Sequence, residues 1–135
     1  PATGSIDATL RPNDLVYVQI GKEIYKNHCS SCHGLQLESQ KGWQTKLVDG
    51  MRLAPPHDAS GHTWHHPDYY LFAMTKFGIE KLIGQRYPNN MPAYEEILKD
   101  EEIIAVLSYI KSTWPDQIEE RHNKINQNYK ATRDG

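Results

Sequence analysis

Two thiols and an imidazole lie together in one short run, CSSCH, which contains Cys29, Cys32 and His33. Thiols at this spacing form thioethers with the two vinyl groups of one haem, because the two intervening residues let both sulfurs reach the same porphyrin edge. The imidazole beside the second thiol is then delivered to the iron as its proximal ligand. The run therefore predicts one covalently attached haem c.

Two other kinds of site use closely spaced cysteines. A zinc site needs about four ligands, and the chain has only 2 cysteines. A thioredoxin-like redox pair follows a strand in an α/β pattern, and no such pattern surrounds this run. Since Cys29 and Cys32 both belong to the motif, no cysteine remains for a disulfide.

A haem iron with one histidine ligand has a second axial position to fill. The candidates are Met51, Met74, Met91 or another histidine. Met91 is set apart by its context, YPNNMPAY, because a stiff segment held by Pro92 aims a thioether without the regularity of a helix. The alternative is that Met91 fills a gap in the core, which is the commoner fate of a methionine.

The elements around these residues are predicted to be helical. Asn13 or Asp14 can cap a helix that starts at Leu15 and leads into the CSSCH run. Further helices are expected over about 69–77, capped by Asp68, over 101–114, capped by Asp100, and over 116–130. The stretches 35–67 and 79–94 are expected to be irregular, except for one short helix near residues 43–48, and no segment is a convincing strand.

Composition narrows the class of protein. The chain has 135 residues, a formal net charge of −2 and 38% hydrophobic residues, and its mean hydropathy is −0.72. This length fits one domain, and the charge provides no basic field for nucleic acid. No apolar run approaches the length of a membrane span. The chain begins at Pro1 with no signal peptide, which indicates a processed mature protein or a piece of a longer one.

Three blocks in combination resemble the class I cytochromes c. They are a first helix with Gly21 and Tyr25 that runs into CSSCHG, a Met-Pro-Ala-aromatic segment at 91–94, and a helix that reads VLSYIKSTW. The resemblance implies an all-α cytochrome c fold, with three to five helices wrapped around one covalent haem c and long ordered loops. It places the cytochrome domain at 14–114, an N-terminal tail or linker at 1–13 and a C-terminal helical extension at 115–135.

The resemblance also assigns roles to single residues. His33 and Met91 match the two axial ligands of the family. Gly21 matches the glycine that lets the last helix cross the first closely, against Val106 and Tyr109.

In the family, a proline carbonyl accepts the Nδ1–H of the proximal histidine. Here Pro55 and Pro56 compete for that role.

Four histidines crowd into a ten-residue stretch that also contains Trp64: His57, His62, His65 and His66. Imidazole suits copper and zinc, so a second metal site is one interpretation, and a bis-histidine haem is another. The favoured interpretation is that these side chains donate hydrogen bonds to the haem propionates, with His62 and Trp64 as haem contacts.

The implied function is one-electron transfer between redox protein partners, one a donor and the other an acceptor. With both axial positions filled the iron has no open site for substrate, so the chain is expected to be an electron carrier and not an enzyme. The alternatives are a cytochrome domain or subunit of a larger redox enzyme, and a haem sensor or catalytic haem with an openable sixth position. The resemblance places the protein in the bacterial periplasm.

Overall fold

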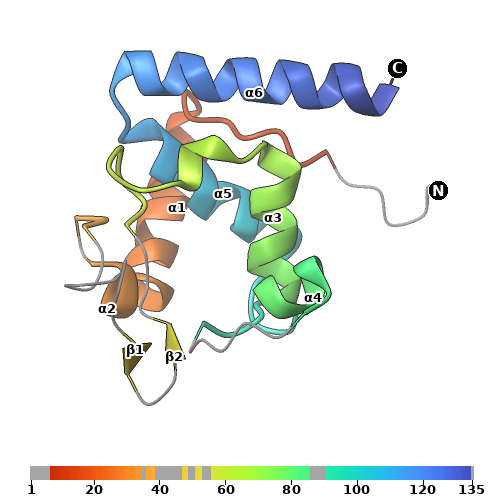
Figure 1. Cartoon of the computed structure of the whole chain (residues 1–135). Helices are drawn as coiled ribbons and strands as arrows, with labels where there is room; N and C mark the ends of the chain where they lie inside the picture. The colour runs from red at the N-terminus through yellow and green to blue at the C-terminus, as the bar shows by residue number, and fades with distance from the viewer. Residues whose placement is uncertain are drawn as a thin grey trace.

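The computed structural model describes residues 7–34, 36–38, 47–48, 51–52, 56–85 and 91–134. Its helices are α1 (Leu15–His28), α2 (Ser30–His33), η1 (a 3₁₀ turn, Thr63–His65), α3 (Asp68–Phe77), α4 (Ile79–Ile83), α5 (Asp100–Ser112) and α6 (Asp116–Asp134) (Figure 1). The predicted all-α fold is confirmed, and five of the α-helical segments precede α6. In the described part of the chain, no helix has both the length and the apolar character needed to cross a membrane.

The stretch 35–67 contains two elements that the sequence does not predict, a short strand pair and the turn η1. The short helix expected near 43–48 is wrong for 47–48, the described residues of that range, because they form a strand. Strands β1 (Leu47–Val48) and β2 (Met51–Arg52) pair antiparallel. Two residues per strand are too few to show the alternation that identifies a strand in a sequence.

Helix α1 begins where its sequence predicts. The Asp14 carboxylate accepts hydrogen bonds from the backbone N–H groups of Val16 (3.1 Å) and Tyr17 (3.3 Å). These bonds satisfy two of the donors that a helix leaves unpaired in its first turn. Helix α1 therefore starts at Leu15 and leads directly to the CSSCH run.

Helices α1 and α5 cross at Gly21. A Cβ atom at this position would collide with the carbonyl oxygen of Ala105 and lie 2.9 Å from the Cβ of Tyr109. The expected contact with Tyr109 is present, but the nearest atoms belong to Ala105 and not to Val106. Only a glycine lets the two backbones approach this closely.

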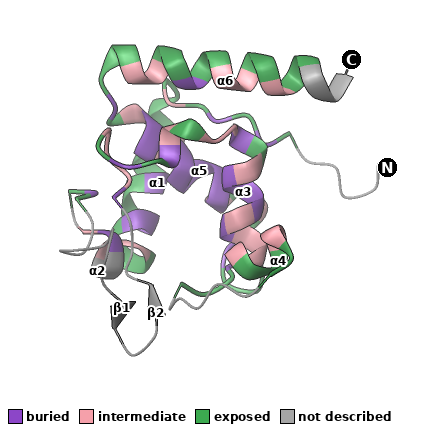
Figure 2. Cartoon of the chain, in the orientation of Figure 1, coloured by how far each residue is buried: buried purple, intermediate pink, exposed green. Residues whose placement is uncertain are grey.

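The hydrophobic core lies where α1, α3 and α5 meet (Figure 2). Its largest members from these helices are Ile24, Tyr25, Leu71, Phe72, Ile103, Ile104, Val106, Leu107 and Ile110. Burial of each such side chain contributes about 1.5–3 kcal/mol relative to leaving it exposed. Most of the list comes from α5, which makes this helix the centre of the molecule.

The N-terminal segment 7–13 packs against this core. Ala8 and Leu10 are buried. The N–H of Leu10 donates to the Asp68 carboxylate (3.0 Å), and the N–H of Arg11 donates to the Ser108 hydroxyl (2.8 Å). The backbone of this segment is thus tied to both α3 and α5.

Helix α6 extends the predicted 116–130 helix to Asp134 and covers one end of the molecule (Figure 1). His122 is fully buried, and its Nε2 lies 2.9 Å from the carbonyl oxygen of His66. The side-chain amide of Asn126 donates a hydrogen bond to the Asp68 carboxylate, and its oxygen accepts one from the backbone N–H of Asp68. Polar side chains therefore fasten α6 to the rest of the chain.

The expectation of an irregular stretch over 79–94 is wrong for its first residues, which form α4. Gly78, with φ of 89°, ends α3, and Gly84, with φ of 71°, ends α4. Two such glycines allow a single short helix between them, which is too brief to show a clear helical period.

Asp68 and Asp100 were expected as helix caps and instead are the first residues of α3 and α5. At α5, the N–H of Lys99 is satisfied by the Glu102 carboxylate (2.8 Å). The Asp100 carboxylate is then available to Lys76 of α3, at 2.9 Å. Both aspartates make contacts with other elements, which local sequence does not reveal.

Candidate haem site

The CSSCH run folds as one helical turn directly after α1. Cys29 is the residue between α1 and α2, and its carbonyl oxygen accepts the N–H of His33 at 2.9 Å. The backbone of Cys32 lies on the same turn. The local geometry that thioether attachment requires is therefore present: both cysteines and the histidine belong to one turn of chain.

Tyr25 fixes the end of this turn. Its buried hydroxyl donates to the carbonyl oxygen of Gly34 at 2.6 Å, and burial raises the pKa of that hydroxyl above its usual value. Gly34 has φ of 88°, a value that side chains with a Cβ rarely adopt. The turn is thus closed by a glycine and held to α1 by a tyrosine.

His33 is buried, with 6% of its surface exposed. Its ring packs against that of His57, with 4.0 Å between the ring centroids and 38° between the planes. Burial, followed by the neighbouring His33, holds the pKa of His57 well below its usual value. A neutral His57 therefore backs the expected proximal ligand.

The other members of the histidine cluster lie differently. His62 is exposed, and its ring lies 5.0 Å from that of His65. Trp64 stacks on His65 at 3.8 Å and donates its indole N–H to the carbonyl of Ala59. The structure thus brings His57 to His33. The haem contacts that the sequence predicts for His62 and Trp64 stay predictions.

Of the two competing prolines, Pro55 lies outside the described residues. Pro56 is fully buried, and its carbonyl oxygen lies where a Cβ on Gly61 would collide with it. The absence of a side chain at Gly61 lets the loop fold back tightly on Pro56. The bond from His33 Nδ1–H to one of the two proline carbonyls stays a prediction.

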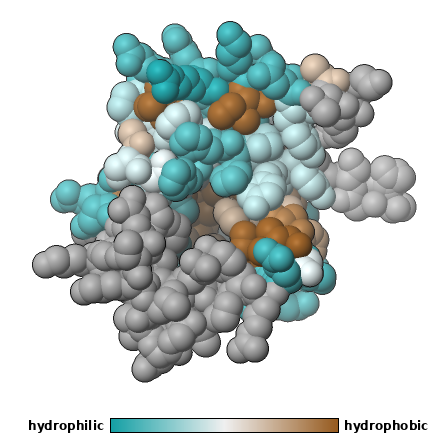
Figure 3. All heavy atoms as spheres, viewed as in Figure 1, coloured by the Kyte–Doolittle hydropathy of each residue, from teal (hydrophilic) through white to brown (hydrophobic). Residues whose placement is uncertain are grey.

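Met91 lies on the wall of an open cleft of about 590 Å³. The other lining residues come from the end of α3, from α4 and from the residues just after it, and include Phe77 and Ile79. Hydrophobic atoms gather over the corner between α3 and α4 (Figure 3). Met91 itself has 38% of its surface exposed.

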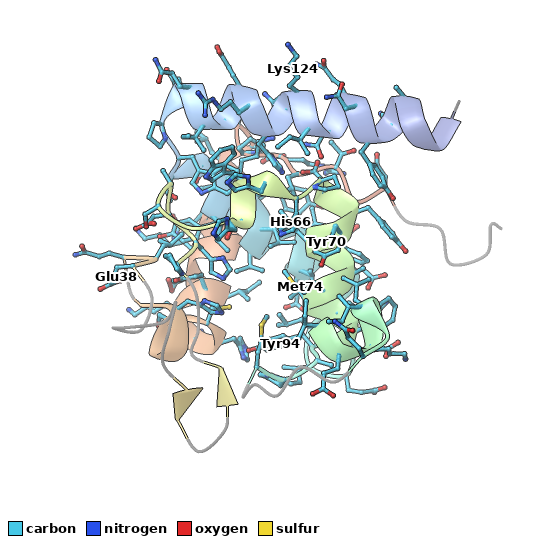
Figure 4. All side chains as sticks on the ribbon, viewed as in Figure 1. Glu38, His66, Tyr70, Met74, Tyr94 and Lys124 are labelled. Atoms are coloured by element: carbon cyan, nitrogen blue, oxygen red, sulfur yellow. The ribbon has the colours of Figure 1, made fainter. Side chains whose placement is uncertain are left out.

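The other two methionines occupy different positions. Met74 is half-buried against the core, on the side of α3 that faces α1 (Figure 4). Met51 belongs to β2.

Tyr94 ties the segment after Met91 to both sides of the molecule. Its N–H donates to the carbonyl of Thr75 in α3 (3.0 Å), and its hydroxyl donates to the carbonyl of His28 at the end of α1 (2.8 Å). The methionine segment is therefore tied to the end of α1, directly before the turn that carries the cysteines.

These residues fit a covalently bound haem. One helical turn carries the two cysteines and a buried imidazole, and a separate anchored segment carries a partly exposed methionine. Imidazole and thioether are the axial ligands of many cytochromes c. In the part of the chain that the structure describes, no three His, Cys, Asp or Glu side chains gather into a further metal-binding group.

Sequence signals for this site were uneven. The CSSCH run was identifiable by its spacing alone, but nothing distinguished His57 from the three histidines near it. Trp114, whose indole N–H donates to the carbonyl of His57 at 2.8 Å, was assigned only to the last core helix. Both residues acquire their roles from contacts between segments that are distant in sequence.

The comparisons with known proteins agree with this geometry. The sequence model of the family described as cytochrome c matches residues 18–114, which extend from the first turn of α1 to Trp114. Searches of the curated proteins and of the solved structures found no match. The family match covers most of the chain and contains the CSSCH turn, and it shows that this chain belongs to the cytochrome c family, as a class I c-type cytochrome with one covalent haem c and a role in electron transfer.

Proposed function

We propose that this protein is a one-electron carrier in which His33 and Met91 bind the haem iron in both oxidation states. Two observations together carry the proposal. The His33 imidazole is buried on the cysteine-bearing turn, and the segment that contains Met91 is anchored through Tyr94 to the end of α1, directly before that turn. The bound haem supplies the ferric/ferrous couple.

The protein's part is to hold both axial ligands in place and to limit the access of water to them. His33 lies between its own turn and the ring of His57, which restricts its movement. Tyr94 ties the Met91 segment to α1 and α3, so the two ligands belong to elements that are bonded to each other. Ligands that stay in place during oxidation and reduction need little rearrangement for each electron transferred.

Redox proteins are the proposed partners, one as donor and one as acceptor. We favour a diffusible carrier in the periplasm, since covalent attachment of haem c takes place outside the cytoplasm. A cytochrome domain or subunit of a larger redox enzyme is the second candidate, and helix α6 favours it, because α6 follows the family match and is mostly polar.

Replacement of each methionine in turn tests the ligation. Met91→Ala is expected to abolish the weak near-infrared charge-transfer band of the ferric protein, to lower the reduction potential and to let carbon monoxide bind the ferrous protein. Loss of a thioether ligand has these effects because methionine ligation raises the potential and closes the sixth position.

Met74→Leu is the matched control, since Met74 is half-buried in the core and leucine keeps its volume. The band is expected to survive in this variant. If the band disappears in Met74→Leu and persists in Met91→Ala, the assignment of Met91 is wrong.

A further inference from the structure

Trp114 connects the C-terminal part of the chain to the proximal side of the site. It follows α5, and only 4% of its surface is exposed. Its indole N–H donates to the carbonyl of His57 at 2.8 Å. Because the His57 ring packs on His33 at 4.0 Å, one hydrogen bond separates Trp114 from the residue that supports the expected ligand.

His57 is held by two more hydrogen bonds. Its N–H donates to the carbonyl of Leu37 at 2.9 Å, and its ring Nδ1 lies 2.7 Å from the Thr63 hydroxyl. Backbone and ring are thus both fixed, and the ring cannot turn away from His33 while these bonds persist. The bond from Trp114 completes this set.

Helix α6 supports Trp114 in turn. The His122 ring meets the Trp114 ring edge to face, with 5.2 Å between centroids and an angle of 84°. The Nε2 of His122 also lies 2.9 Å from the carbonyl of His66. The loop from His57 to His66 is therefore held at one end by Trp114 and at the other by α6.

We propose that Trp114 is a positioning residue for the proximal ligand: it holds His57 against His33, fixes the ligand ring and keeps water from it. The proposal rests on ligation by His33, as set out under the proposed function. Residues behind a ligand orient it and tune the metal. Water admitted beside His33 stabilises the more positive ferric state, so a weaker hold lowers the reduction potential.

Trp114→Phe in the haem-loaded protein tests this role, because it removes the N–H donor and keeps an aromatic ring. The expected result is a lower midpoint potential and faster hydrogen exchange at the His57 amide, with the absorption spectrum of the ligated haem retained.

Ser108→Ala is the matched control. It removes one buried hydrogen-bond partner, that of the Arg11 N–H, from the neighbouring helix α5. Its melting temperature is expected to fall, with the potential and the exchange at His57 unchanged. If Trp114→Phe behaves in the same way, Trp114 has only a structural role and the proposal is overturned.

If Trp114→Phe does not fold, Thr63→Val tests whether the position of His57 affects the reduction potential. It removes the hydroxyl that lies beside the His57 ring and nearly keeps the side-chain volume. A lower potential is expected here too, and an unchanged one overturns the proposal. Failure of the Trp114 proposal can be distinguished from failure of the proposed ligation. A wild-type ferric spectrum without the features of histidine ligation contradicts the role of His33. Unchanged hydrogen exchange at the His57 amide in Trp114→Phe contradicts only the role of Trp114.

Discussion

Gly21 is the residue on which the crossing of α1 and α5 depends. In a helix, Gly→Ala ordinarily stabilises by about 0.5–1 kcal/mol. At Gly21 the new methyl group would collide with the Ala105 carbonyl, which is backbone and cannot rotate aside. We therefore expect Gly21→Ala to destabilise the protein by on the order of 3 kcal/mol, as severe overpacking does.

The measurement is chemical denaturation of the haem-loaded protein. Glu23→Ala, at an exposed position of the same helix, is the control and should leave the free energy of unfolding nearly unchanged. An increase in stability for Gly21→Ala would show that the helices do not meet at this residue.

Local chemistry explains which residues of the site were predictable. Cys29, Cys32 and His33 form a motif because their roles depend on spacing within one turn. His57 has no such signal, since its contact with His33 depends on where a loop of mostly polar residues folds. The cap of α1 was predictable to within one residue, as Asn13 or Asp14, because the bonds of Asp14 reach only the next three residues.

At the scale of elements, the attachment of α6 centres on a buried imidazole. His122 Nε2 faces the carbonyl of His66 and, at 3.5 Å, the Asp68 carboxylate. Its Nδ1 has no hydrogen-bond partner among the described residues. Burial, and then the nearby Lys111, lower the pKa of His122 to about 4, although Asp68 and the bond to His66 act in the opposite direction.

This attachment is expected to weaken in acid. Between about pH 6.5 and 4 the unfolded chain binds a proton at His122 and the folded chain does not, so stability falls as the pH falls through this window. A shift from 6.5 to about 4 corresponds to on the order of 3 kcal/mol. Below about pH 4 both states are protonated and the loss is complete.

The measurement compares the melting temperature of the wild type and of His122→Gln across this range. Burial also lowers the pKa of His57, His65 and His66. Because His122→Gln still contains these three histidines, the variant is expected to keep part of the pH dependence of the wild type. The slope is expected to be shallower in His122→Gln. Equal slopes would mean that His122 does not couple the docking of α6 to pH.

Element boundaries were predictable where a cap or a glycine marks them. Asp14 begins α1, Gly78 ends α3, and Pro115 separates α5 from α6. The role of Asp68 was not predictable, because its carboxylate serves Leu10 and Asn126, each 58 residues away in the chain. The sequence shows that an aspartate at this position is a suitable cap. It does not show that the carboxylate forms its hydrogen bonds with distant segments instead.

At the scale of the whole molecule, we expect two parts: one whose elements contact each other directly, and one that is stabilised by the bound haem. Helices α1 and α5 cross directly, and α6 and the segment 7–13 are tied to α3 and α5 by side-chain hydrogen bonds. Helix α4 contains no buried residue, and 38% of the surface of Met91 is exposed. With a mean hydropathy of −0.72, the chain has little apolar surface in reserve to close the second part.

Hydrogen exchange on the double variant Cys29→Ala/Cys32→Ala tests this division, since it compares a haem-free chain with the haem-loaded wild type. Denaturing mass spectrometry first establishes one haem per wild-type chain and none in the variant. A bound group stabilises only the state that binds it, so α4 and the segment around Met91 should lose protection first. Amides at the crossing of α1 and α5 should keep much of theirs, because these two helices contact each other directly at Gly21 and α5 supplies most of the helical core side chains. Uniform loss of protection across α1, α4 and α5 would contradict the division and show that the protein folds only as a single unit around its haem.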